Sequence, residues 1–190
     1  MVNGWTRLGL FALGGLMIAF GLSEPDVASV LDPRLKEIAA QRPDAFMEGV
    51  YQRRYDADGQ LETTLVATSI LDFGERARAE LVDPKVWLER PPATWYIEGD
   101  FGQLSGDRNQ LFLTDNVTAN RLEAGTATWT LSGDTLNWDQ TTDLVTSEDQ
   151  TTLVQDTAVS QGESLVMNLN TNEYTLGKQV ITQWHSTSSD

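Results

Sequence analysis

Apolar and polar residues alternate in short runs through most of the second half of the chain, over residues 103–180. The alternation is complete in 126–132, where threonine separates Ala127, Trp129 and Leu131. Side chains of a β-strand point to opposite faces with a period of two, so these apolar side chains must share one face. The pattern predicts half-buried antiparallel strands around an apolar interior.

Segments that contain Gly with Ser, Asp or Asn separate these runs. Ser-Gly-Asp occurs at 105–107 and again at 132–134, and a looser copy is found at 160–163. Turns favour these residue types, so we expect turns there, including one at Gly133-Asp134. Strands are expected near 47–55, 61–71, 76–82, 85–89, 94–99, 103–104, 110–114, 117–122, 126–131, 135–138, 144–146, 151–154, 157–160, 164–169, 173–176 and 179–184. Many short strands at this spacing predict an all-β sandwich, jelly roll or barrel.

The N-terminal segment has a different pattern. Residues 2–22 carry a single charge, Arg7, and as a helix they would span about 31 Å, close to the hydrocarbon thickness of a bilayer. Charge bias places the N-terminus in the cytoplasm and the rest of the chain across the membrane. The residues that define this anchor are Trp5, Arg7, Leu8, Gly14 and Leu22. The competing interpretation is a cleaved signal peptide, since Ala19-Phe20-Gly21 is an acceptable small-x-small site.

The domain organisation follows from these patterns. We expect a transmembrane anchor over 1–23, a linker with a short helix over 24–43, a β-domain over 44–185 and a polar tail over 186–190. Asp32-Pro33 supports the short helix, because Asp is a favoured N-cap and Pro suits the first helical position.

Composition and charge exclude several function classes. The chain has 28 acidic and 13 basic residues and a formal charge of −15, which argues against nucleic acid as a partner. It has no cysteine, so disulfides and thiolate metal sites are excluded. A hydrophobic content of 40% and six Trp predict a packed core and argue against global disorder.

Candidate catalytic and metal-binding motifs are weak. Asp56-Ala57-Asp58-Gly59 begins like a calcium loop, but its Gly and Glu positions do not fit, so we expect a hairpin turn. Gly177-Lys178 lacks the rest of a phosphate-binding loop, and His185 is the only histidine, with no paired nucleophile. We therefore expect no enzyme activity, no metal and no cofactor.

Strand phase assigns a set of apolar side chains to the interior of the β-domain. They either form a closed core or line a groove for an apolar ligand, and periodicity does not distinguish the two. The candidates are Leu65, Leu81, Leu88, Trp95, Ile97, Leu113, Trp129, Leu131, Leu136, Trp138, Leu165, Met167 and Leu169.

The order of several short motifs is similar to that of the LptC family, the membrane-anchored component of the lipopolysaccharide export bridge. After the apolar N-terminus come Pro43-Asp44-Ala45-Phe46-Met47-Glu48-Gly49-Val50, Tyr55-Asp56-Ala57-Asp58-Gly59-Gln60-Leu61, Thr94-Trp95-Tyr96-Ile97-Glu98-Gly99-Asp100, Asp115-Asn116-Val117 and Asp143-Leu144-Val145-Thr146-Ser147-Glu148-Asp149. The last is the closest match. Asp115 replaces the usual Gly before Asn116-Val117, which affects the expected local turn geometry.

The resemblance implies an open, twisted β-jelly roll in the periplasm of a Gram-negative bacterium, preceded by a single transmembrane helix. It implies that lipopolysaccharide passes along an apolar groove, without catalysis. It also implies that the upstream edge and the helix bind the membrane subunits of an inner-membrane ABC transporter, and that the downstream edge binds a soluble periplasmic bridge protein. The edge candidates are Met47, Gly49, Tyr51, Tyr174, Leu176, Val180 and Thr182.

Alternative functions remain open from the sequence. One is an anchored scaffold with a closed β core that only pairs edge to edge with other proteins. Another is a soluble carrier that is released after signal cleavage. In the edge strand 47–55, Arg53-Arg54 could also serve as charges that protect the edge.

Overall fold

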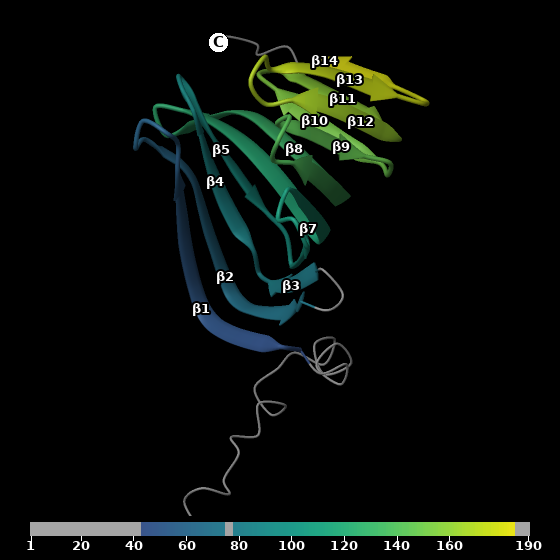
Figure 1. Cartoon of the computed structure of the whole chain (residues 1–190). Helices are drawn as coiled ribbons and strands as arrows, with labels where there is room; N and C mark the ends of the chain where they lie inside the picture. Colours follow the sequence, from purple (N-terminus) through teal and green to yellow (C-terminus); the bar gives the residue numbers. More distant parts are fainter. Residues whose placement is uncertain (1–42, 75–77, 185–190) are drawn as a thin grey trace, which may run out of the picture. The chain divides into compact units, whose positions relative to one another are not determined.

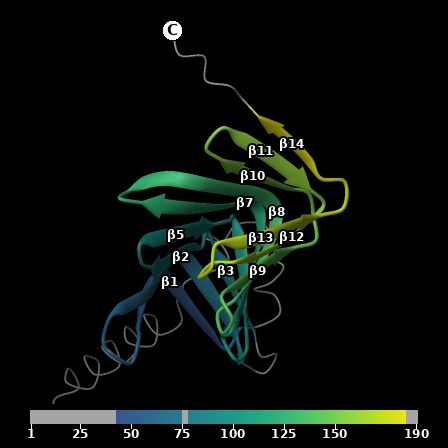
Figure 2. The same ribbon diagram turned by 90° about the horizontal axis from the view of Figure 1, so that it is seen from above.

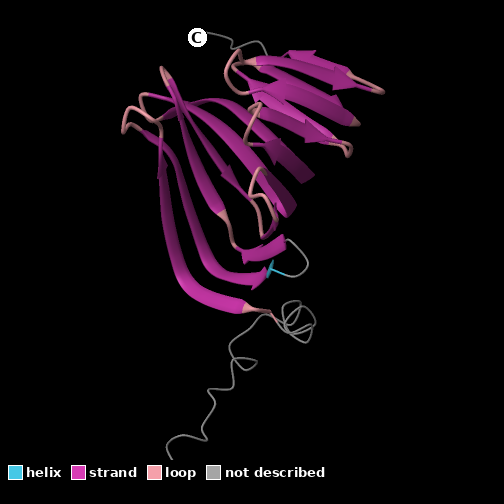
Figure 3. Cartoon of the chain, in the orientation of Figure 1, coloured by secondary structure: helices cyan, strands magenta, loops and turns pink. Residues whose placement is uncertain are grey.

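The computed structural model describes residues 43–74 and 78–184, whose regular structure is almost entirely β (Figure 3). These residues belong to one compact unit, Pro43–Asp190. The expected anchor, most of the linker and the tail lie outside the described residues. Within 43–74 and 78–184 there is no helix with the length and apolarity to cross a bilayer.

The described residues form one sheet of 14 strands, which confirms the all-β prediction. The strands are β1 (Ala45–Tyr55), β2 (Leu61–Phe73), β3 (Arg78–Val82), β4 (Lys85–Arg90), β5 (Ala93–Glu98), β6 (Phe101–Ser105), β7 (Gln110–Glu123), β8 (Thr126–Asp139), β9 (Leu144–Ser147), β10 (Thr151–Gln155), β11 (Ala158–Gly162), β12 (Ser164–Asn168), β13 (Glu173–Gly177) and β14 (Ile181–Trp184). Figure 1 shows β1 and β2 as long bent ribbons at one end of the sheet and β13 and β14 at the other. Figure 2 shows β14 beside β11 in the view from above.

The pairing pattern shows that this sheet is folded into two layers. Layer I has the order β1-β2-β4-β5-β7-β8-β10-β11-β14, and layer II has the order β1-β2-β3-β6-β7-β8-β9-β12-β13. Each of β2, β7 and β8 pairs with one neighbour along one half and with another along the other half. These strands therefore cross from layer to layer, and all pairs are antiparallel. The line along which these strands cross between the layers is called the crease. The opposite side, where the hairpin turns of the two layers face each other, is called the mouth.

Irregular backbone marks the crease. Gly49, at φ +58°, lies where β1 bends, and a left-handed conformation of this kind suits glycine. In β7, Asp115 and Asn116 both have positive φ, and the pair lies opposite a single residue of β8, because Thr114 pairs with Thr135 and Val117 with Gly133. Such a β-bulge bends the strand and increases its twist.

The predicted turn at Gly133-Asp134 is wrong, because both residues lie within β8. The expected strands 126–131 and 135–138 are one strand, as are 110–114 and 117–122 in β7. The glycine is needed for a close approach: a Cβ on Gly133 would lie 3.2 Å from the backbone oxygen of Gln150. Gly, Asp and Asn occur in β-bulges as well as in turns, so the composition of this segment did not distinguish a bulge from a turn.

Other predicted turns are present where expected. In the Asp56–Gly59 turn, Asp56 Oδ1 accepts hydrogen bonds from the backbone N–H groups of Asp58 at 2.9 Å and Gln60 at 2.8 Å. In the turn after β6, the backbone N–H of Arg108 donates to the carbonyl oxygen of Ser105 at 2.9 Å.

The apolar interior lies between the two layers. Leu88 of layer I and Leu113, Val145 and Met167 of layer II are completely inaccessible to solvent. The inward phase changes along β8: Leu131 faces inward before Gly133, and Leu136 faces inward after it. The crease thus allows one strand to contribute to both walls of the same interior.

Candidate functional site

The structure brings the sequence-predicted interior residues together. Leu65, Leu81, Leu88, Trp95, Ile97, Leu113, Leu131, Leu136, Trp138, Leu165, Met167 and Leu169 all belong to one buried apolar cluster, and Trp129 packs against it. Leu169 follows the end of β12 at Asn168 and is still buried. That these side chains contact an apolar ligand stays a prediction.

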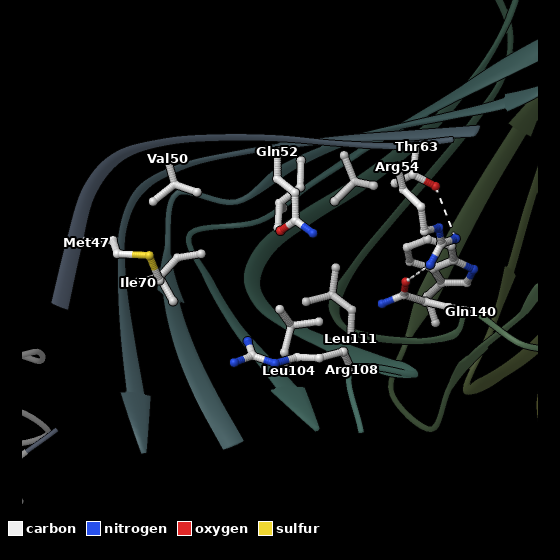
Figure 4. A pocket seen from close by; sticks show the side chains of 13 residues that line it. Met47, Val50, Gln52, Arg54, Thr63, Ile70, Leu104, Arg108, Leu111 and Gln140 are labelled. Atoms are coloured by element: carbon white, nitrogen blue, oxygen red, sulfur yellow. Dashed lines mark hydrogen bonds between the residues drawn. The ribbon is translucent and has the colours of Figure 1, made fainter. Parts of the chain in front are cut away.

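A cavity of about 350 Å³ opens into the interior near β1 (Figure 4). Its lining is mostly apolar and includes five polar side chains. The lining residues are Met47, Val50, Gln52, Arg54, Thr63, Leu65, Ile70, Val86, Leu104, Arg108, Leu111, Trp138 and Gln140. Of these, only Leu65 and Trp138 were predicted as interior residues, and Met47 was predicted as an edge residue.

Arginines of layer I reach across the mouth to turns of layer II. Arg54 Nη1 donates to Gln140 Oε1 at 2.7 Å, as Figure 4 shows. Arg121 Nε donates to Asn172 Oδ1 at 2.9 Å. Each acceptor lies in a turn, Gln140 between β8 and β9 and Asn172 between β12 and β13.

The strongest of these contacts joins Arg90 and Asp143. Arg90 donates from Nη2 to Asp143 Oδ1 at 2.8 Å and from Nε to Asp143 Oδ2 at 2.9 Å. Both side chains are 12% exposed, so the pair is largely shielded from water. A bidentate arginine–carboxylate pair adds geometric specificity to the attraction between the charges.

Asp143 also links other groups to this pair. It accepts hydrogen bonds from Trp138 Nε1 at 3.4 Å and from Asn170 Nδ2 at 3.0 Å, and its backbone oxygen accepts from the N–H of Leu169 at 3.0 Å. Its φ is +53°, a conformation that Asp and Asn tolerate better than most residues. One turn residue therefore holds together β4, β8 and the β12–β13 turn.

Aromatic rings continue the row of contacts across the mouth. Trp129 of layer I meets Tyr174 of layer II edge to face, with ring centroids 5.6 Å apart. Trp129 also meets Trp95 at 6.3 Å, and the Arg121 guanidinium lies 5.9 Å from the Trp129 ring centre. The mouth is thus closed by side chains from both layers.

Two side chains on the outer faces of the sheet, Glu80 and Tyr96, have a shifted pKa. Burial raises the pKa of Glu80, against the opposing effect of Arg78. Burial also raises the pKa of Tyr96, with further contributions from its hydrogen bond to Glu98 and from that group's charge. The described residues hold no cluster of three or more metal-ligating side chains.

The predicted partner edges lie at the two ends of the sheet. Among residues 43–74 and 78–184, β1 pairs with β2 alone, and its other side has no strand partner there. Met47 and Tyr51 of this strand are 43% and 58% exposed, and Gly49 lies at its bend. The upstream edge is therefore available for pairing.

The downstream edge consists of the two strands expected near 173–176 and 179–184. They are β13 in layer II and β14 in layer I, because β13 pairs with β12 and β14 pairs with β11. Val180 precedes β14, which begins at Ile181. Tyr174 and Leu176 lie opposite the buried Met167 and Leu165, so they follow the inward phase, and Thr182 contacts Ser160 at 2.9 Å.

Sequence reasoning missed several exposed or polar residues at these places. Ile181 and Trp184 are 58% and 75% exposed at the downstream edge. Arg121 could have been found from strand phase, since it lies two residues after the inward-facing Ala119. Arg54 differs from its neighbour Arg53 in this respect: Arg54 lines the cavity, and Arg53 stacks on the outer side chain of Tyr51, 5.0 Å from its ring centre.

Comparisons with known proteins agree with this architecture. The crystal structure of LptH, "the LptA homologous periplasmic component of the conserved lipopolysaccharide transport device from Pseudomonas aeruginosa", is similar with a TM-score of 0.55 and 14% identity. The match covers 65% of this chain and 95% of that one, and at this identity it shows a common fold. A search of curated proteins gave no match. The family model described as "Lipopolysaccharide-assembly, LptC-related" matches residues 10–185, so the chain belongs to the LptC family of lipopolysaccharide-assembly proteins.

Proposed function

We propose that the chain relays lipopolysaccharide from an inner-membrane ABC transporter to a soluble periplasmic bridge protein, without catalysis. The observation that carries this proposal is a folded sheet whose two apolar walls enclose one interior, with an unpaired strand at each end. Family membership supports the same role in lipopolysaccharide transport.

The physical requirement is to keep acyl chains out of water during transfer. Each buried CH₂ is worth about 0.8 kcal/mol, so a lipid with several chains does not cross an aqueous space unaided. Walls of Leu, Val, Met and Trp offer acyl chains an environment similar to a bilayer. Because such contacts are not directional, they hold the chains without fixing one bound shape.

The partners follow from the edges. An unpaired strand edge binds another strand through main-chain hydrogen bonds. We assign β1 to the transporter subunits and β13 with β14 to the bridge protein, and we assign residues 1–23 to a membrane anchor beside the transporter. In this arrangement the β-domain is periplasmic and the N-terminus is cytoplasmic.

Site-specific photo-crosslinking tests the proposal. A photoreactive amino acid replaces Trp129, which packs against the interior, and Thr130 on the outer face serves as the matched control. Cells that produce each full-length variant are irradiated, and lipopolysaccharide adducts are detected on the purified protein. We expect adducts at 129 and none at 130.

A scaffold with a closed core is the second candidate, and one observation favours it. Side chains such as Leu88, Leu113 and Met167 are fully buried, so most of the interior is filled. If neither position gives an adduct while the protein is folded and in the membrane, the scaffold function replaces the relay function.

A further inference from the structure

We propose that the arginine contacts across the mouth form a latch, which an acidic lipid with several chains opens. The latch consists of Arg54, Arg90 and Arg121 of layer I and their acceptors Gln140, Asp143 and Asn172. This inference rests on the proposed function and specifies how its cargo reaches the interior.

The capacity of the interior requires an opening step. The cavity near β1 has a volume of about 350 Å³ and is confined to one end of the interior. Beyond the cavity, residues such as Val145 and Met167 have no accessible surface. A lipid with several chains fits only if the layers move apart.

The architecture determines where the layers separate. At the crease the layers are joined covalently and by continuous strands, since β2, β7 and β8 run through both. At the mouth, the contacts between the described residues of the two layers are made by side chains, namely the latch and the Trp129–Tyr174 ring contact. Separating side chains breaks no strand ladder, so the crease is the hinge and the mouth is the side that opens.

The chemistry of the latch selects the ligand that opens it. Separation takes the Asp143 carboxylate from Arg90 and the Asn172 oxygen from Arg121, whereas Glu62 and Glu123 of layer I stay beside these arginines. The two arginine side chains are only 12% and 11% exposed, so water replaces the lost acceptors poorly. A phosphate can accept the bidentate hydrogen bonds that Asp143 gives up. The arginines lie at the rim of the apolar interior, where the headgroup of a lipid with buried chains would be. A neutral lipid offers hydroxyl and carbonyl oxygens but no anionic acceptor.

A reversible staple across the mouth tests the latch. The chain has no cysteine, so an R54C/Q140C pair can be joined specifically by a bis-maleimide with a reducible central disulfide. The matched control is an E89C/T94C pair, which joins β4 to β5 within layer I. Each full-length protein also carries the photoreactive residue at 129 and is mixed with purified lipopolysaccharide.

We expect the mouth staple to lower adduct formation at least about tenfold, because binding is reduced by the fraction of protein that can open. Reductant should restore it, and the control staple should have no effect. If unstapled protein forms no adduct, the proposed function fails. If stapled and unstapled proteins load equally, the latch is refuted and the relay function stands.

A second measurement keeps the test independent of the staple. R54Q removes a guanidinium from the latch, and R53Q changes its outward-facing neighbour in the same way. We expect R54Q to load lipopolysaccharide about 2–10-fold faster, the range that one or two hydrogen bonds are worth, and R53Q to load at the original rate. Dephosphorylated lipopolysaccharide should load more slowly than the phosphorylated form in the unmodified protein. Equal rates for the two lipids would refute the selection of acidic headgroups.

Discussion

Replacing Asp143 by alanine tests how strongly the β8–β9 turn is held. The carboxylate receives a bidentate pair from Arg90 at 2.8 and 2.9 Å and further hydrogen bonds from Trp138 and Asn170. The substitution removes all of these acceptors at once. It also places alanine at φ +53°, where a Cβ without a polar side chain is strained.

The magnitude follows from these contributions. Breaking a buried ion pair by removing one partner costs about 3–5 kcal/mol, because the other charge stays buried. The Arg90 side chain is 12% exposed, so we take the lower end of that range. The left-handed backbone adds about 1 kcal/mol for alanine. We expect Asp143→Ala to lower the free energy of unfolding by about 4 kcal/mol, and Asp143→Asn, which keeps the turn conformation and some acceptors, by about 1–3 kcal/mol.

Urea unfolding, followed by tryptophan fluorescence, measures these changes in the full-length protein. The matched control is Asp156→Ala, since Asp156 is exposed and has φ +50° in the β10–β11 turn. Asp156→Ala also places alanine in a left-handed backbone conformation, but it leaves the buried Arg90–Asp143 pair intact. We therefore expect it to lower the free energy of unfolding by about 1 kcal/mol. If Asp143→Ala costs no more than Asp156→Ala, Asp143 does not hold the turn and the reasoning is refuted.

Three further substitutions test the crease, the core and the outer face. Gly133→Ala should cost about 1–3 kcal/mol, measured by urea unfolding, because the new Cβ would lie 3.2 Å from the Gln150 oxygen; an unchanged midpoint would remove the close-packing argument. Met167→Ala should lower the free energy of unfolding by about 2–5 kcal/mol in the same assay, since Met167 is fully buried. A decrease below about 1 kcal/mol would mean that the two layers move together and fill the cavity that the substitution leaves. Glu80→Gln should raise the melting temperature at pH 7 and change it little at pH 3. The folded state raises the pKa of Glu80, so its stability contribution is present below the unfolded pKa and is lost as pH rises through the folded pKa; a lower melting temperature at pH 7 would contradict this sign.

Strand periodicity predicted many of the side chains that share the interior, but it was wrong for Ala127, which is exposed where the β7–β8 register shifts. Leu165 and Met167 alternate with polar or exposed residues along a single strand, and this alternation is a local property of the sequence. Each layer is built from such strands, so local phase was enough to assign many side chains to the interior. The same information did not show how tightly the walls pack, because this depends on the distance between two layers.

The latch could not be predicted, because its partners are far apart in the chain. Arg90 and Asp143 are separated by 53 residues, and Arg54 and Gln140 by 86. An arginine in an amphipathic strand is usually solvated, and only the crease brings it opposite a turn of the other layer. The crease itself was misjudged, since Gly133 and Asp134 have the composition of a turn and lie within a strand.

The two ends of the sheet are complementary in a way that bears on transfer. Upstream, the single strand β1 has 11 residues, bends at Gly49 and belongs to both layers. Downstream, β13 has 5 residues and β14 has 4, and between them Lys178 and Gln179 have φ of +53° and +47°. A partner that offers one bent strand like β1 could therefore pair with both downstream strands at once and extend both walls. In the proposed relay, a partner that pairs with only one of them would extend one wall and leave acyl chains open to water on the other side. The proposed transfer along an unbroken apolar path thus requires a partner whose own sheet is folded in the same way.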